Sequence, residues 1–335
     1  MGKFALQYQV EKRPFVEPFR ISGYVFEHTE LLVVTLSDGE HAGRGEAAGV
    51  YYVGDDIAHM TGQLEKHRDA IENCASREEL RSLLPADGAR NAVDCAMWDL
   101  EAARAGKQAW KLAGLDSVRP LVTTFTVGAN EPAKMAQDAR NYAGATALKV
   151  KLTGELDLDI ARVAAVRDAC PDVWLGVDAN QGFSIAELDR LVEGLGEQKV
   201  SLLEQPLARG RESDLEGYKS PIPLAADESA LDLGDVAGLV GRFEVLNIKL
   251  DKCGGLTEAL LMVAEARRLG LGLMVGNMTG TGLAMAPAFI VAQHCDFVDL
   301  DGPVFLAEDR SPTVEYSNGT IWCPDEVWGS GTPVA

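Results

Sequence analysis

The sequence lacks a long hydrophobic run, any CxxC pair of cysteines and an excess of basic charge. No apolar run approaches the length of a membrane-spanning helix, and no long apolar region follows the lysine near the start, so we expect a cytoplasmic protein with no membrane partner. A formal net charge of -20 argues against nucleic acid or anionic membranes as partners, because either would require a basic surface. The cysteine spacing argues against disulfides and structural zinc; the six cysteines lie at 74, 95, 170, 253, 295 and 323.

The length and composition predict one α/β barrel with a smaller partner domain. With 335 residues and 47% hydrophobic content, the chain can bury a large core and exceeds one average domain. Residues 1–118 show strand patterns at 4–8, 31–36 and 42–46, followed by helical periodicity that is strongest at 89–105 and ends at Gly106. We therefore predict an α+β capping domain over 1–118. Two aromatic segments, 18–24 and 49–55, are expected as loops that cover a site, with ordinary packing of loop aromatics left open.

After Pro120 the sequence becomes a repeat of short apolar strands separated by helical stretches. This alternation predicts a modified (β/α)8 TIM-type barrel over 119–308. The segment 309–335 has no slot in the barrel, and we expect it to return to the capping domain and complete it. The eight predicted strands lie near 122–127, 147–152, 174–180, 202–206, 224–228, 246–251, 273–277 and 297–301.

Three acidic residues stand at the ends of successive predicted strands. They are Asp178, Glu204 and Asp227, and in a (β/α)8 barrel the carboxyl ends of the strands carry the functional residues. Each alone would more often be a capping or surface residue, but three in register predict a metal site. An all-carboxylate set without histidine or cysteine favours one Mg²⁺ over zinc.

Lysines flank this trio on the strands before and after it. Lys151 precedes it in the alternating segment with Lys149, and Lys249 follows it. A strand with an isolated Lys-x-Lys pattern is more often an edge strand with a solvated basic face. In a closed barrel, however, the strands before and after the trio place Lys151 and Lys249 on opposite sides of the metal. Such an arrangement suits removal of a proton from the carbon next to a carboxylate, through an enediolate, by one lysine and its return by the other. We therefore predict a racemase or epimerase.

These motifs resemble the enolase superfamily, in its muconate-lactonizing subgroup, over nearly the whole chain. The resemblance implies that Asp178, Glu204 and Asp227 bind Mg²⁺ and that Lys151 and Lys249 are the acid/base residues. It also implies that Lys149 contacts the substrate carboxylate and lowers the pKa of Lys151. The matching pieces are Leu148-Lys149-Val150-Lys151, Val177-Asp178-Ala179-Asn180, Glu204-Gln205-Pro206, Ala226-Asp227-Glu228-Ser229 and the segment 247–255.

Within that subgroup the chain looks most like the dipeptide epimerases of the L-Ala-D/L-Glu type. The discriminating piece is Asp299-Leu300-Asp301, which in that family receives the free ammonium of the dipeptide. Because no basic residue is adjacent to them in sequence, we expect these two carboxylates to be unpaired until substrate binds. Thr126 and Met278 match positions that line the substrate.

The expected capping-domain contacts to the substrate are Tyr24 and Arg20. The glutamate-specific relatives carry an arginine where we align Tyr24, and Arg20 lies four residues earlier. The side-chain preference of the substrate therefore stays open. The sequence also leaves open the pathway and whether the chain forms a homo-oligomer. Two other functions also stay open: an N-acyl-amino-acid racemase or o-succinylbenzoate synthase-like lyase on the same scaffold, and a non-catalytic binding barrel.

Overall fold

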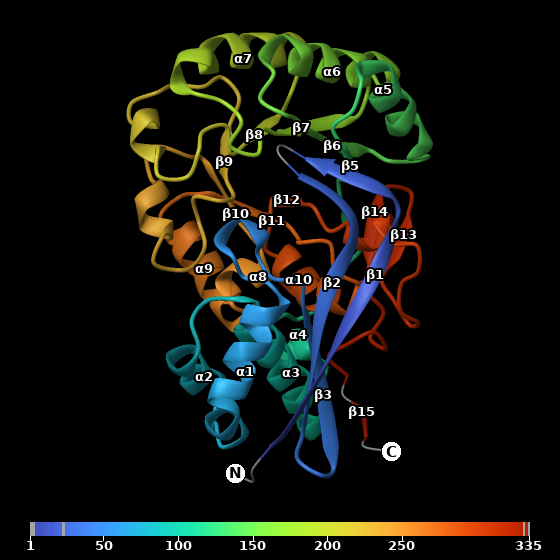
Figure 1. Cartoon of the computed structure of the whole chain (residues 1–335), viewed down its shortest axis with the longest axis vertical. Coiled ribbons are helices and arrows are strands. Elements are labelled where there is room, and N and C mark those ends of the chain that lie inside the picture. Colours follow the sequence, from blue (N-terminus) through green and yellow to red (C-terminus); the bar gives the residue numbers. More distant parts are fainter. Residues whose placement is uncertain (1–3, 22–23, 331, 334–335) are drawn as a thin grey trace.

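The structure is a computed structural model that describes residues 4–21, 24–330 and 332–333. Its amino-terminal part is built on an antiparallel sheet in the order β1-β2-β3-β15. The strands are β1 (Ala5–Ile21), β2 (Tyr24–Ser37), β3 (His41–Ala47) and β15 (Thr332–Pro333). Figure 1 shows β1 and β2 rising together from this sheet along the barrel, and the carbonyl oxygen of Arg20 in β1 accepts a hydrogen bond at 3.2 Å from the backbone nitrogen of Ala129, just after β5.

The hairpin corrects the prediction of a loop over 18–24. Strand β1 continues to Ile21 and β2 begins at Tyr24, while residues 22 and 23 lie outside the described residues. The pairing shifts register between Pro14 and Phe19 and then resumes with Phe19 opposite Phe26. Proline is tolerated in edge strands and at bulges, so Pro14 and Pro18 interrupt the strand pattern without ending the strand.

The capping helices are η1 (Tyr51–Val53), α1 (Ile57–Glu72), α2 (Arg77–Leu83), α3 (Gly88–Ala105) and α4 (Ala109–Leu112). Helix α3 lies directly on β3, because a Cβ added at Gly43 would stand 2.2 Å from the carbonyl oxygen of Ala96. Its amino end is capped by Asp87, and it ends at Gly106 in a left-handed conformation with φ of 58°. The helix predicted over 89–105 is therefore confirmed.

The barrel contains all eight predicted strands in one parallel sheet in the order β5 to β12. The backbone nitrogen of Thr124 donates to the carbonyl oxygen of Val298 at 2.9 Å, which joins the two ends of the sheet. Between β9 and β10 the chain forms a 3-10 helix, η3, in place of an α-helix. The strands are β5 (Phe125–Val127), β6 (Ala147–Lys151), β7 (Trp174–Asp178), β8 (Leu202–Glu204), β9 (Leu224–Ala226), β10 (Val245–Ile248), β11 (Gly272–Val275) and β12 (Phe297–Val298).

Helices cover the outside of this sheet, as Figure 1 shows for α5 to α7 at one side and for α9 and α10 at the other. Apolar side chains fill the layer between strands and helices and form the largest hydrophobic cluster of the described residues. The helices are α5 (Pro132–Asn141), α6 (Leu156–Ala169), α7 (Ile185–Glu197), η2 (Glu212–Leu215), η3 (Val236–Leu239), α8 (Leu250–Cys253), α9 (Leu256–Arg268), α10 (Gly282–Ala292) and η4 (Gly302–Phe305).

The carboxyl-terminal segment connects the two parts of the molecule. Strand β13 (Glu315–Ser317) pairs with β14 (Thr320–Trp322), β14 pairs with β4 (Leu121–Val122), and β15 pairs with β3 of the capping sheet. Arg310 forms ion pairs with Glu46 at 3.0 Å and with Glu11 at 2.9 Å. Within the described residues, no helix is both long enough and apolar enough to cross a membrane.

Candidate active site

The three predicted metal-binding carboxylates meet at the carboxyl ends of neighbouring strands. Asp178 ends β7, Glu204 ends β8 and Asp227 directly follows β9. One carboxylate oxygen of each lies within 4.8 Å of the others, and all three residues are fully buried. Burial and the charge of Asp178 raise the pKa of Glu204 to about 7, although its Oε2 atom lies 2.7 Å from Lys149 Nζ. A buried set of three carboxylates, with oxygen as the only donor atom, fits a hard dication such as Mg²⁺.

Lys149 lies among carboxylates inside the barrel. Its Nζ is 2.7 Å from Glu204 Oε2, 2.8 Å from Asp299 Oδ2 and 3.4 Å from Asp178 Oδ2. Burial alone would lower the pKa of Lys149, but the charges of Asp299, Glu204 and Asp178 outweigh it and raise that pKa well above its ordinary value. Lys149 is therefore a permanent positive charge beside the trio.

Lys151 and Lys249 approach the trio at different carboxylates. Lys151 Nζ is 2.6 Å from Asp178 Oδ2, whereas Lys249 Nζ is 2.8 Å from Asp227 Oδ2. Burial would lower the pKa of Lys249, but Asp227 outweighs it and the pKa is raised. Lys151 ends β6 and Lys249 directly follows β10, so the two ammonium groups reach the trio from separate strands.

A neighbouring lysine, Lys252, has a different position. Its side chain is fully buried, and its Nζ is 2.7 Å from Asp227 Oδ1 and 2.6 Å from the carbonyl oxygen of the same residue. It does not line the cavity that Lys151 and Lys249 face. Lys252 therefore orients Asp227 from the side away from the cavity, a role that the sequence does not indicate.

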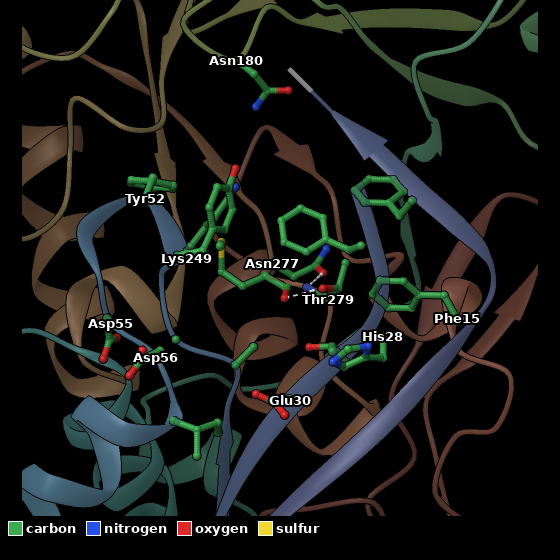
Figure 2. Close-up of a pocket in the computed structure, with 18 of the residues that line it drawn as sticks. Phe15, His28, Glu30, Tyr52, Asp55, Asp56, Asn180, Lys249, Asn277 and Thr279 are labelled. Atoms are coloured by element: carbon green, nitrogen blue, oxygen red, sulfur yellow. Dashed lines mark hydrogen bonds between the residues drawn. The ribbon is translucent and has the colours of Figure 1, made fainter. Parts of the chain in front are cut away.

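A cavity of about 280 Å³ lies between the trio and the capping domain. Lys151, Lys249 and Met278 line it from the barrel, which brings the two predicted acid/base lysines to one cavity. Figure 2 shows the cavity with the β1–β2 hairpin along one wall and Lys249 and Asn277 on the barrel side. The capping domain contributes Phe15, Phe19, Phe26, His28, Thr29, Glu30, Ala48, Gly49, Tyr51, Tyr52, Asp55, Asp56 and Ile57.

The expectation that Asp299 and Asp301 are both unpaired is wrong for Asp299. Its Oδ2 pairs with Lys149 at 2.8 Å, and its Oδ1 accepts a hydrogen bond from the Thr124 hydroxyl at 2.5 Å. Asp301 Oδ2 accepts a hydrogen bond from the backbone nitrogen of Thr126 at 2.6 Å, and the Thr126 side chain also hydrogen-bonds to this carboxylate. Burial and the charge of Asp299 raise the pKa of Asp301 to about 7. Asp301 is therefore the acid of this pair that lacks a basic partner among the described residues.

The two capping-domain residues singled out from the sequence lie beyond the cavity lining. Tyr24 is 47% exposed, and its ring packs 4.6 Å from the ring of Tyr51, which does line the cavity. Arg20 is exposed and borders a separate groove at the hairpin tip together with Thr126. Neither residue is brought to the lysines by this structure.

Sequence reasoning missed the residues of β2 that do line the cavity. They are Phe26, His28, Thr29 and Glu30, and of these Phe26, His28 and Glu30 are spaced by two and share one face of the strand. The sequence predicts a strand only over 31–36, so these four residues fall outside it. The predicted second lid segment, 49–55, does lie on the cavity through Tyr51 and Tyr52, and Asp251 Oδ1 fixes its start by accepting from the backbone nitrogen of Ala48 at 2.8 Å.

Comparison with known proteins agrees with this architecture. Residues 7–114 match the amino-terminal domain of the mandelate racemase / muconate lactonizing enzyme family, and residues 131–333 match the enolase C-terminal domain-like family. The chain therefore belongs to the mandelate racemase / muconate lactonizing enzyme family of the enolase superfamily. Its named relatives are epimerases and racemases, so the protein is an isomerase.

The individual relatives cover nearly the whole chain. It is 38% identical to L-Ala-D/L-Glu epimerase of Escherichia coli, over 93% of this chain and 97% of that one. It is 36% identical to N-acetyl-D-glutamate racemase of Pseudoalteromonas sp, over 87% and 92%.

Solved structures show the same fold. An enolase family member from Agrobacterium tumefaciens with homology to dipeptide epimerases, with bound sodium and L-Ala-L-Glu, superposes with a TM-score of 0.92 at 40% identity, over 97% and 100% of the chains. A dipeptide epimerase from Cytophaga hutchinsonii, complexed with Mg and D-Ala-L-Val, superposes with a TM-score of 0.90 at 25% identity, over 98% and 95%.

Proposed function

We propose that the protein is a Mg²⁺-dependent dipeptide epimerase that works by two-base proton transfer at the carbon next to the substrate carboxylate. One observation carries this proposal: Lys151 and Lys249 face one cavity and pair with different members of the carboxylate trio, Asp178 and Asp227. Two bases at opposite ends of a metal site can serve opposite faces of one carbon. The relatives named as dipeptide epimerases support the same chemistry.

In this proposal Asp178, Glu204 and Asp227 hold the Mg²⁺. The bound ion supplies positive charge where negative charge develops on the substrate carboxylate. Lys149 contributes a second, fixed positive charge beside the metal-binding carboxylates, because Asp178, Glu204 and Asp299 hold its ammonium group in place. Lys151 takes the proton from the α-carbon of one epimer, and Lys249 returns a proton to the opposite face.

The free ammonium of a dipeptide would bind at Asp301. Asp299 is already paired with Lys149, whereas Asp301 is hydrogen-bonded by the neutral groups of Thr126 and its pKa is raised by burial. A substrate ammonium beside Asp301 would compensate this buried carboxylate. Thr126 fixes the orientation of Asp301 through its backbone nitrogen. An N-acyl amide carries no charge and would leave Asp301 uncompensated.

The capping wall favours an apolar side chain on the epimerised residue over glutamate. Phe15, Phe19 and Phe26 form one side of the cavity, and Glu30 lies on the same strand face as Phe26. Among the described lining residues, the capping domain provides no lysine or arginine that could bind a side-chain carboxylate. A glutamate there would face aromatic rings and like charge, which costs free energy.

The experiment that tests this function is a substrate panel followed by ¹H NMR in D₂O with Mg²⁺. We expect exchange of the α-hydrogen and epimerisation for L-Ala-L-Phe and L-Ala-L-Leu, with lower kcat/KM for L-Ala-L-Glu. Absence of α-hydrogen exchange for every dipeptide would contradict the epimerase proposal.

A second candidate is an N-acyl-amino-acid racemase, favoured by the 36% identity to N-acetyl-D-glutamate racemase. The same panel includes N-acetyl and N-succinyl amino acids. A higher kcat/KM for these than for every dipeptide would replace the leading proposal with this one.

A further inference from the structure

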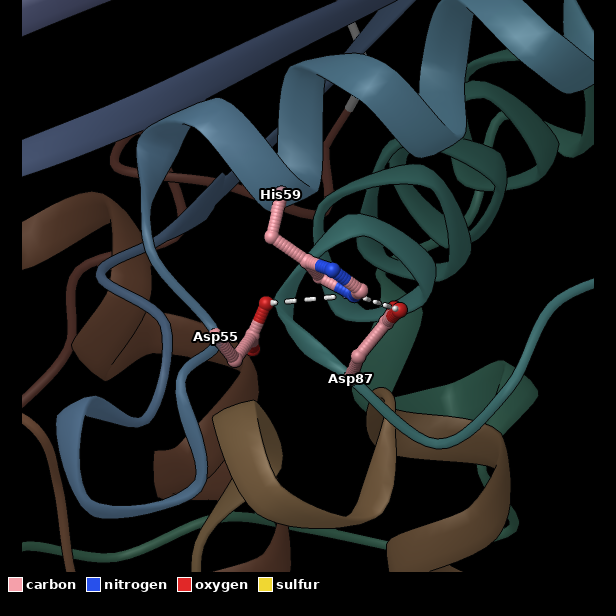
Figure 3. Close-up of side chains that lie close together, drawn as sticks. All are labelled: Asp55, His59 and Asp87. Carbon is pink, nitrogen blue, oxygen red and sulfur yellow. Dashed lines mark hydrogen bonds and ion pairs between the residues drawn. The ribbon is translucent and has the colours of Figure 1, made fainter.

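Three side chains of the capping domain lie close together, away from the carboxylate trio of the barrel. Asp55 lies at the end of the lid segment, His59 in the first turn of α1, and Asp87 at the amino end of α3, as Figure 3 shows. His59 Nε2 is 3.3 Å from Asp87 Oδ2 and 3.9 Å from Asp55 Oδ1. One ligand atom of each residue lies within 4.8 Å of the other two. The group shares no residue with Asp178, Glu204 and Asp227.

Backbone hydrogen bonds already orient both carboxylates. Asp55 Oδ2 accepts from the nitrogen of Gly88 at 2.8 Å, and Asp87 Oδ1 accepts from the nitrogen of Arg90 at 2.9 Å as the cap of α3. The second oxygen of each carboxylate is thereby turned toward the imidazole of His59. Ligands fixed through their other polar atom are typical of built metal sites, because little ordering remains to be done when the ion binds.

A second observation points to a ligand at this place. Asp55 is only 5% exposed, and its Oδ1 has no hydrogen-bond partner among the described residues. Leaving a buried carboxylate oxygen unpaired is costly unless a charged group compensates it. Burial and the negative charge of Asp87 raise the pKa of Asp55 to about 6, although the backbone hydrogen bond from Gly88 lowers it. The raised pKa agrees with an ionised Asp55 that lacks a compensating charge.

We propose that Asp55, His59 and Asp87 form a second metal site, selective for a transition-metal dication such as Zn²⁺. One imidazole nitrogen with two carboxylate oxygens suits Zn²⁺, Co²⁺ or Ni²⁺ better than Mg²⁺, which prefers an all-oxygen set like that of the barrel. The side chain of His59 is 42% exposed, so the site can be loaded from solution and keeps open positions for water.

The site would connect metal binding to the lid of the active site. Val50 and Asp55 pair through both backbone bonds, at 2.9 and 3.2 Å, and close the short loop that carries Tyr51 and Tyr52. Both tyrosines line the catalytic cavity. An ion held by Asp55, His59 and Asp87 would fix the end of this loop to α1 and α3, and thus hold Tyr51 and Tyr52 against the cavity.

The test is calorimetric titration of the full chain with Zn²⁺ in excess Mg²⁺, together with the melting temperature with and without Zn²⁺. The variants are His59→Ala and Asp87→Asn, because asparagine keeps the cap of α3 but loses the ligand charge. His67→Ala, on the same helix, is the matched control for binding to any imidazole. Comparison between variants cancels any Zn²⁺ taken up by the barrel trio, which all of them retain.

We expect the wild type and His67→Ala to bind one more Zn²⁺ per chain than His59→Ala and Asp87→Asn, and to gain a Zn²⁺-dependent rise in melting temperature that both variants lose. Equal stoichiometry in all four proteins would overturn the proposal and leave His59 as a hydrogen-bond partner of Asp87 only. Loss of Zn²⁺ binding in His59→Ala but not in Asp87→Asn would also contradict it, because the site needs both carboxylates.

Discussion

Replacing Asp301 with asparagine separates the dipeptide epimerase from its closest alternative. Asp301 is 2% exposed, and its Oδ2 accepts a 2.6 Å bond from Thr126 N, a bond that an asparagine oxygen can also accept. The change therefore removes a charge and keeps the local fold. Removing one partner of a buried charge pair costs about 2 to 5 kcal/mol. We expect kcat/KM for dipeptides to fall by roughly 30- to 4,000-fold at 1.4 kcal/mol per factor of ten.

The pH dependence of the wild type gives a second measure of the same interaction. Burial and the charge of Asp299 raise the pKa of Asp301 to about 7, and only the ionised carboxylate attracts an ammonium. As the pH rises through about 7, Asp301 loses its proton, so kcat/KM for dipeptides should increase. It should fall again near pH 8, where an α-amino group loses its own charge. Asp301→Asn should lose the rise near pH 7.

The assay is NMR-detected epimerisation of one dipeptide and one N-acetyl amino acid by both proteins. Asp296→Asn is the matched control, because Asp296 lies at the amino end of β12 and pairs with Arg267. The control should keep its dipeptide kcat/KM. The reasoning is refuted if Asp301→Asn keeps the wild-type value for dipeptides while the wild type prefers the N-acetyl substrate.

Three further predictions follow from named contacts. EDTA should abolish activity and Mg²⁺ should restore it, and Asp227→Asn should be nearly inactive with an unchanged circular dichroism spectrum. Full turnover by the metal-free enzyme would refute the assignment of the carboxylate trio as a required metal site. Lys151→Ala should exchange the α-proton of one epimer in D₂O and Lys249→Ala that of the other; equal loss for both epimers in both variants would refute the two-face assignment. Arg310→Met should lower the free energy of unfolding by about 3 to 5 kcal/mol, because it leaves Glu46 buried without its ion pair. Urea denaturation measures this change, and the exposed Arg268→Met should cost at most about 1 kcal/mol; an equal effect of both would contradict it.

The barrel could be predicted from the sequence because its signal is local and repeated. Each strand is a short apolar run, and each is followed by a helix or turn within the same stretch of chain, so the count of eight strands was correct. The hairpin could not be predicted, because its stability depends on pairing between β1 and β2 across a bulge at Pro14 and Phe19. Local residue preferences at 18–24 indicate a loop, and the partner strand overrides them.

The convergence of the carboxylates and lysines could be predicted because each stands at the carboxyl end of an apolar strand. Asp178, Glu204 and Asp227 need only the rule that strand ends converge. The pairing of Asp299 with Lys149 could not be predicted, because it joins residues 150 positions apart that only the closed barrel brings together. For the same reason the sequence did not show that Lys252 holds Asp227 from behind.

These contacts give a physical reason for having two lysines on β6. Lys149 pairs with Asp299, a residue outside the trio, so it keeps an acidic partner whatever the trio binds. For Lys151, the one ion pair among the described residues is with Asp178, and for Lys249 it is with Asp227. A cation held by the trio competes for those two carboxylates, and an ammonium that loses its acidic partner beside a positive charge gives up a proton more readily. Lys149 is therefore suited to remain a fixed charge, which fits the proposal that Lys151 and Lys249 are the two lysines that exchange protons with the substrate.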